Sequence, residues 1–150
     1  MNLSPHFTLE EMIGSRDHPE IPNQPDSTVL ARLETLAWRM EQVRSILGNK
    51  PISVSSGYRS PALNVAVKGS KTSVHMEGRA IDFTSPSFGT PSEIVAALRH
   101  HIKPLGVDQI LLEYPRNPNG GWVHVGLREY EFCRFQCLAY HGGNDYEVLV

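Results

Sequence analysis

The segment from Ser73 to Phe83 constrains the fold more than any other part of the chain, because it sets a charge inside an apolar strand. Asp82 stands between Ile81 and Phe83 in a run with the apolar character of a strand. Aspartate is almost never fully buried without a partner, so an inward-facing Asp82 needs a cation or a metal ion. His75 lies seven residues earlier, and imidazole and carboxylate groups are both zinc ligands.

A third ligand is needed, because a catalytic zinc takes three protein ligands and leaves its fourth position open. The best candidate is His124, which lies in the alternating segment from Gly121 to Gly126 on the same predicted strand face as Trp122. Taken singly, a histidine or aspartate beside a strand is more often a hydrogen-bonding or surface residue than a ligand. The joint pattern predicts a zinc site formed by His75, Asp82 and His124.

Helix caps and periodicity predict an α+β fold in one domain, with a small antiparallel sheet packed against helices. The helices are expected after the capping box of Thr8 and Glu11, from Thr28 to Gly48, from Ser60 to Val67, and after Thr90 and Pro91. The strands are expected at 52–55, at 80–83, and at 107–114 and 121–127, which should pair as an antiparallel hairpin. Residues 130–150 are interpreted as a further hairpin, with alternation from Phe132 to Ala139 and a terminal strand from Tyr146 to Val150.

Composition narrows the class of protein. A chain of 150 residues corresponds to one domain, and 40% apolar with 20% charged residues is ordinary for a globular protein. The net charge is −2 and the sequence has no dense cluster of lysine and arginine, so we expect no nucleic-acid partner. No run approaches the roughly 20 apolar residues that span a bilayer, so we expect no membrane insertion. The first residues lack the features of a secretion signal, so we expect a cytoplasmic protein until another factor releases it.

Four blocks resemble the zinc D-alanyl-D-alanine carboxypeptidase family, which includes phage lysins that cut peptidoglycan peptides. The blocks are Ser56 to Asn64, Ser73 to Asp82, Asp108 to Glu113, and Trp122 to Val125. Their order makes the resemblance more specific than any single block, and it runs from about residue 7 to residue 127. It implies the fold shared by the lysostaphin-type peptidases and the hedgehog signalling domain.

The resemblance also implies roles for individual residues. It implies His75, Asp82 and His124 as the ligands of one zinc ion, and an active-site position for Arg59. A structural ion pair is the alternative for Arg59. Manganese or iron could also occupy a site of two histidines and one carboxylate. The implied partners are peptidoglycan peptides, for a monomer in which 1–150 is the peptidase domain and 128–150 an extra C-terminal hairpin.

The general base is where the sequence departs from the family pattern. Endopeptidase members carry a glutamate three residues before the last zinc histidine, where this chain has Gly121. Some carboxypeptidase members carry a histidine five residues before it, where this chain has Asn119. Our hypothesis is that Glu113 is the base, and the alternative is that Glu113 orients a zinc histidine. Glu77 and Asp108 are weaker candidates, the first beside His75 in a loop and the second on the opposite strand face.

Three functions therefore compete. The leading hypothesis is zinc-dependent hydrolysis of peptide bonds in stem peptides that contain D-amino acids, in a phage or prophage lysin or in a virion-associated lysin. The second is a non-catalytic zinc-containing binding domain of the same fold, which the missing glutamate and histidine favour. The third is a metal-free structural protein. The motifs do not determine which peptidoglycan bond is cut.

Overall fold

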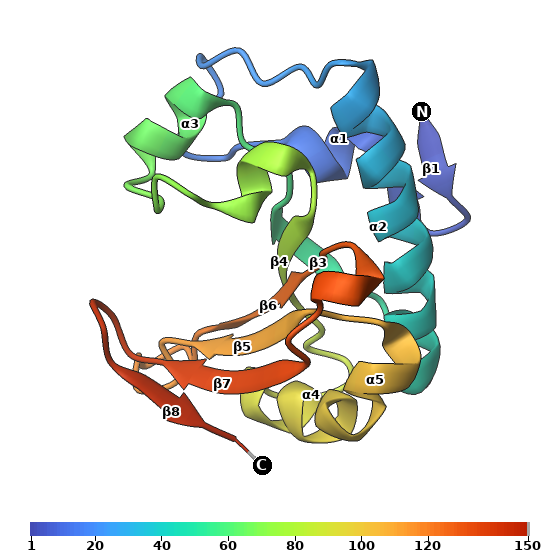
Figure 1. Cartoon of the computed structure of the whole chain (residues 1–150), viewed down its shortest axis with the longest axis vertical. Coiled ribbons are helices and arrows are strands. Elements are labelled where there is room, and N and C mark those ends of the chain that lie inside the picture. Colours follow the sequence, from blue (N-terminus) through green and yellow to red (C-terminus); the bar gives the residue numbers. More distant parts are fainter. Residues whose placement is uncertain (150) are drawn as a thin grey trace.

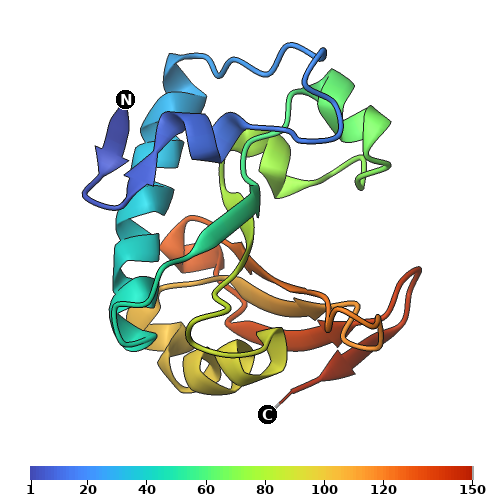
Figure 2. The ribbon, with the colours of Figure 1, turned by 180° about the vertical axis from the view of Figure 1, so that it is seen from behind.

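The computed structural model of the chain describes residues 1–149 and confirms the predicted α+β class (Figure 1). A six-stranded sheet forms the centre, with α4 and α5 on one side and α3 and the short helix η1 on the other (Figure 1). The long helix α2 stands beside the sheet and extends from the level of α1 to α5 (Figure 1). From behind, the N-terminal hairpin lies beside α2 (Figure 2).

The helices, with the short 3-10 segments named η, are α1 (Leu9–Ile13), α2 (Ser27–Ile46), α3 (Pro61–Ala66), η1 (Val74–Glu77), α4 (Pro91–Leu98), η2 (Arg99–His101), α5 (Ile102–Leu105) and η3 (Tyr130–Phe132). The strands are β1 (Asn2–Ser4), β2 (Phe7–Thr8), β3 (Ser53–Ser56), β4 (Ala80–Thr84), β5 (Gln109–Glu113), β6 (Trp122–Gly126), β7 (Gln136–Tyr140) and β8 (Tyr146–Val148). Within residues 1–149, no helix combines the length and the apolar character needed to cross a bilayer.

Side-chain caps explain where the helices begin. The Thr8 side chain accepts from the backbone of Glu11, whose own side chain accepts from the backbone of Thr8, and the same capping box begins α4. Helix α2 begins at Ser27, one residue before the predicted start, because the Asp26 carboxylate accepts from Val29 N at 2.8 Å. The positions at which these helices begin are therefore set by hydrogen bonds to side chains close in sequence.

The main sheet has the strand order β3-β4-β6-β5-β7-β8. The predicted hairpin of β5 and β6 is present, with antiparallel pairing from Gln109 opposite Gly126 to Glu113 opposite Trp122. The prediction of an antiparallel sheet is wrong at one pair of strands. The sheet is mixed, because β7 pairs in parallel with β5 while the other neighbours are antiparallel.

The C-terminal segment differs from the expected alternating strand around Phe132. Residues 130–132 form η3, and the strand begins only at Gln136, after Phe135 with a φ of +52°. The physical reason is the crossover: β6 is followed by a strand on the far side of β5, so residues 127–135 must carry the chain across before pairing can start. The antiparallel pair β7–β8 follows, and Val150 of the predicted terminal strand lies outside the described residues.

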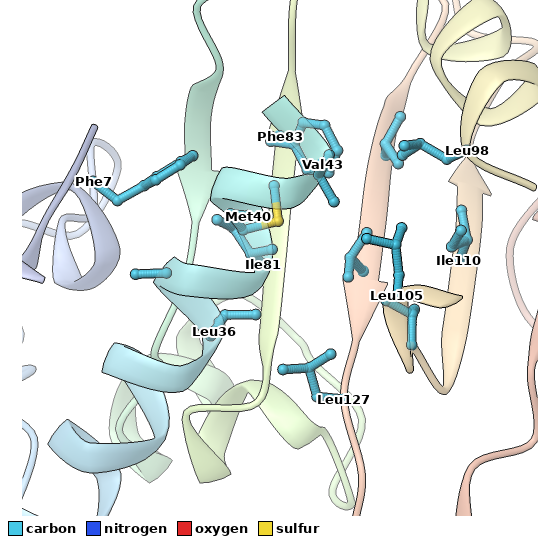
Figure 3. Close-up of a cluster of buried hydrophobic side chains, with 14 of the residues drawn as sticks. Phe7, Leu36, Met40, Val43, Ile81, Phe83, Leu98, Leu105, Ile110 and Leu127 are labelled. Atoms are coloured by element: carbon cyan, nitrogen blue, oxygen red, sulfur yellow. The ribbon is translucent and has the colours of Figure 1, made fainter. Parts of the chain in front are cut away.

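Alternation along the strands separates the core from the site. Ile81 and Phe83 of β4 are fully buried and pack with Met40 and Val43 of α2 (Figure 3). Successive side chains of a strand point to opposite faces, so Asp82 faces away from this core. The predicted core helix thus fixes β4 on one face and leaves the other face free for polar side chains.

Asp108 anchors the start of β5 and gives a testable prediction for stability. Its carboxylate accepts from Arg134 N at 2.7 Å, from Arg134 Nη2 at 2.7 Å and from Arg134 Nε at 3.1 Å. Burial alone would raise the pKa of the Asp108 carboxyl, but the hydrogen bonds from Arg134 outweigh it and hold the pKa below its usual value. The carboxylate therefore stabilises the fold above the unfolded pKa of about 3.9, and this contribution is lost as the pH falls through the folded value.

We expect Asp108→Asn to lower the free energy of unfolding at pH 7 by about 1 to 3 kcal/mol, because hydrogen bonds to charged groups are lost. Below the folded pKa the wild type and the variant should converge in stability. Urea unfolding across pH 3 to 7 measures both effects. Equal stability of the two proteins at pH 7 would contradict the anchoring role.

Candidate metal centre

Asp82 and His124 lie directly opposite each other on neighbouring strands. The register of β4 and β6 pairs Asp82 with His124, and both side chains project from the face opposite the core. The Nδ1 atom of His124 is 2.9 Å from Oδ1 of Asp82. Asp82 is 5% exposed and His124 is 7% exposed. The sheet therefore brings two of the predicted ligands together without any contribution from loops.

His75 reaches the same point from η1. Ser73 caps this short helix and Gly78 ends it at a φ of +72°, where a Cβ would come within 2.8 Å of Val29 on α2. The His75 Nδ1 atom is 2.7 Å from the carbonyl oxygen of Gly57. Since a carbonyl only accepts, the proton is on Nδ1 and the lone pair of Nε2 is free. That Nε2 atom lies 3.4 Å from Oδ2 of Asp82.

These three residues form a buried group suited to one metal ion. One ligand atom from each of His75, Asp82 and His124 lies within 4.8 Å of the others. Burial alone would raise the pKa of Asp82, but His75 and His124 outweigh it and hold the pKa far below its usual range. The donor set is thus an ionised carboxylate and two imidazoles, which matches zinc chemistry. Their roles as metal ligands stay a prediction.

Arg59 lies at the edge of this group. Its Nη2 atom is 3.2 Å from Oδ2 of Asp82, and its Nε atom donates to Ser56 Oγ at 3.0 Å. Nη1 is 3.5 Å from Oδ1 of the buried Asn64, which donates in turn to Ser70 O. Arg59 therefore forms the ion pair considered as one alternative and is also located at the candidate site. Among residues 1–149 these acceptors engage three of its five N–H groups.

Glu113 lies beside His124, as the predicted hairpin suggested. Its Oε1 atom is 3.6 Å from His124 Nδ1, and its side chain is 15% exposed. Burial first, and then the charge of Asp82, raise the pKa of Glu113 to about 7. The carboxyl group is thus placed next to a candidate ligand and can exchange a proton near neutral pH.

The backbone of the β5–β6 turn explains the missing family glutamate. Gly121 has a φ of +76°, and a Cβ at this position would overlap the carbonyl oxygen of Glu113. A glutamate could not replace Gly121 without moving the turn. The Asn119 side chain is part of the same turn, because its Oδ1 accepts a hydrogen bond from Gly121 N at 2.9 Å. Glu113, at the end of β5 beside this turn, is therefore the candidate carboxylate for the general base.

The weaker candidates lie elsewhere. Glu77 is half exposed and lies 3.8 Å from Arg79, and Asp108 is held by Arg134. What sequence reasoning missed is the carbonyl of Gly57, which orients His75. A backbone acceptor carries no side-chain signal, although a glycine ending a predicted strand marks a close approach of two backbones.

This contact predicts a large effect for Gly57→Ala. A Cβ on Gly57 would overlap the carbonyl oxygen of Met12, so either α1 or the Gly57 carbonyl must move. We expect zinc affinity to fall about 10- to 100-fold, as is typical when the hydrogen-bond partner of a ligating histidine is lost. Competition with a chromogenic chelator measures the affinity. Gly48→Ala, at a position of φ +68° where the added Cβ meets no atom within 4 Å, is the control for a general loss of stability, and equal affinities for the two variants would contradict the role of Gly57.

Comparison with known proteins supports a hydrolytic role for this geometry. The family model described as "Peptidase M15" matches residues 5–125. The chain is 37% identical over 97 residues to a protein of Streptomyces albus G named zinc D-Ala-D-Ala carboxypeptidase, a match that covers 63% of this chain. The match spans only 37% of the length of that relative. Together with the buried His–Asp–His group, these similarities support a metallopeptidase with one metal ion as cofactor. Because the model covers most of its length, the chain belongs to the peptidase M15 family.

Proposed function

We propose that this chain hydrolyses peptide bonds in peptidoglycan stem peptides that contain D-amino acids, with one zinc ion held by His75, Asp82 and His124. The observation that carries the proposal is the convergence of these buried side chains beside Glu113 and Arg59. The similarity to the zinc D-Ala-D-Ala carboxypeptidase of Streptomyces albus G supports this class of substrate. The experiment below determines whether the chain cuts a terminal or an internal peptide bond.

A bound zinc ion supplies Lewis-acid chemistry, which polarises a carbonyl group and makes water a better nucleophile at neutral pH. The chain must still move one proton. We propose that Glu113 takes this proton from the attacking water and delivers it to the nitrogen of the leaving amine as the C–N bond breaks. Its burial beside His124 keeps the carboxylate within reach of the reacting groups.

Arg59 has a separate role in this proposal. Its guanidinium is always charged and presents its donors in a fixed plane, which suits the recognition of a carboxylate. Within the described part of the chain, two of its five N–H groups have no acceptor. We propose that they bind a carbonyl or carboxylate oxygen of the peptide and so position the scissile bond.

Mass spectrometry of purified peptidoglycan sacculi, digested with the zinc-loaded chain, tests this function. We expect soluble fragments whose new termini identify one type of peptide bond, and we expect no fragments after treatment with a chelator. Intact sacculi with a protein that still holds stoichiometric zinc would instead support the non-catalytic binding domain. A protein without bound zinc and without activity would support the metal-free structural protein.

The proposal extends to the biological setting of a phage or prophage lysin, which stays in the cytoplasm until a membrane lesion releases it and acts as a monomer. Expression in bacteria, with and without an agent that permeabilises the inner membrane, tests this part. Lysis only after permeabilisation is the expected result, whereas lysis without the agent would contradict it. Gel filtration with light scattering should give the mass of one chain.

A further inference from the structure

A cavity of about 200 Å³ lies away from the metal centre, where α2, the start of β4 and the end of β6 meet. Four arginines line it: Arg32, Arg39, Arg79 and Arg128. Its volume corresponds to several water molecules, since each takes about 30 Å³. Guanidinium groups are charged at every physiological pH. Four like charges around one small space repel each other unless an anion lies between them.

The arginines come from separate parts of the fold. Arg32 and Arg39 are seven residues apart on α2 and so lie on one face of that helix, with Thr35 between them. Arg79 follows Gly78, the residue that ends η1, and Arg128 follows β6. One side of the cavity is therefore built on the core helix α2, and the rest on short segments next to η1, α5 and β6.

Among residues 1–149, carboxylates pair with only two of these arginines, Arg79 and Arg128, and at no less than 3.5 Å. Arg79 has distant partners in Glu77 at 3.8 Å and Glu129 at 3.7 Å, and Arg128 lies 3.5 Å from Asp108. Asp108 itself is already bound by Arg134 at 2.7 Å.

Two of the arginines have no carboxylate partner within 4 Å among residues 1–149. Among the described residues, Arg32 donates only to the carbonyl oxygen of Glu77, at 3.3 Å. Arg39 makes no hydrogen bond or ion pair with any described residue. Its Nη1 atom packs over Gly106, where a Cβ would come within 2.7 Å of it. A guanidinium that lines a cavity and has no carboxylate partner is available to bind an anion.

We propose that this cavity binds a phosphate group. Arginine forks match the geometry of phosphate oxygens, and several arginines around one space suit a tetrahedral anion better than a single planar carboxylate. Arg79, Arg128 and Glu129 also line a neighbouring cavity of about 340 Å³. The same chemistry therefore fits free inorganic phosphate or one unit of a phosphodiester polymer that continues into the second cavity. This site is independent of the proposed hydrolysis.

Isothermal titration calorimetry with inorganic phosphate, at an ionic strength matched with chloride, tests the proposal. We expect saturable binding to the wild-type chain, and a dissociation constant raised about tenfold in Arg39→Gln, because a charge-assisted hydrogen bond is lost. Arg44→Gln, on the same helix but outside the cavity, should bind as the wild type does. Glu129→Gln removes the carboxylate that lines both cavities and should tighten binding.

A second titration, with a glycerol-phosphate polymer, distinguishes the two sources. Tighter binding of the polymer per phosphate indicates the polymer, and equal binding indicates the free ion; both agree with the proposal. The absence of saturable binding by the wild type would overturn it. So would equal affinities for Arg39→Gln, Glu129→Gln and the wild type.

Discussion

Replacing Asp82 by alanine is expected to abolish both zinc binding and hydrolysis. Asp82 is the residue that every other member of the group contacts: His124 at 2.9 Å, Arg59 at 3.2 Å and His75 at 3.4 Å. Its removal deletes one ligand and leaves the positive charge of Arg59 without its carboxylate. We expect zinc affinity to fall by more than about 100-fold, the largest loss typical of an outer partner of a metal ligand.

Metal analysis of the purified variant, together with the release of fragments from sacculi, measures the two effects. Asp145→Ala is the matched control, because Asp145 is exposed in the β7–β8 turn and lies 3.8 Å from Arg116. It should retain full zinc content and full activity. Stoichiometric zinc in the Asp82→Ala protein would show that the metal binds elsewhere.

Glu113→Gln separates catalysis from metal binding. The amide is nearly isosteric with the carboxyl group but cannot take up the proton, so we expect kcat to fall about 10²- to 10⁴-fold. Zinc content and KM should stay close to the wild-type values, since Glu113 lies 3.6 Å from His124 and is not part of the ligand group. Steady-state kinetics on a muropeptide, with metal analysis of the same sample, measures all three quantities.

The alternative role of Glu113 gives a different result. If it only orients His124, Glu113→Gln should weaken zinc binding about 10- to 100-fold, and excess zinc should restore turnover. Glu77→Gln is the control, because Glu77 is half exposed and pairs with Arg79 at 3.8 Å. Turnover of zinc-loaded Glu113→Gln at the wild-type rate would refute the role of general base.

Much of the site could be predicted from the sequence because it is built on strands. A period of two residues sets Asp82 on the face opposite Ile81 and Phe83, and the β5–β6 hairpin sets Glu113 beside His124. These relations depend on local alternation and on turn chemistry. His75 was joined to the group by its ligand chemistry and by the family resemblance, since no local rule places η1 over the sheet.

The parts that could not be predicted depend on long-range geometry. The parallel pairing of β7 with β5 is decided by the crossover after β6, which leaves no signal in the alternation around Phe132. The carbonyl of Gly57 and the cavity around Arg39 arise where separate elements meet, and single residues in the sequence do not reveal such meetings. Tertiary packing decides these features, and local propensity does not.

In the proposed mechanism, His75, Asp82 and His124 hold one metal ion. Anomalous diffraction at the zinc edge, from crystals of the chain grown with zinc, tests it most directly. We predict one peak within about 2.0 to 2.2 Å of His75 Nε2, of a carboxylate oxygen of Asp82 and of His124 Nδ1. A zinc peak at other residues, with these three side chains unligated in an active protein, would contradict the account.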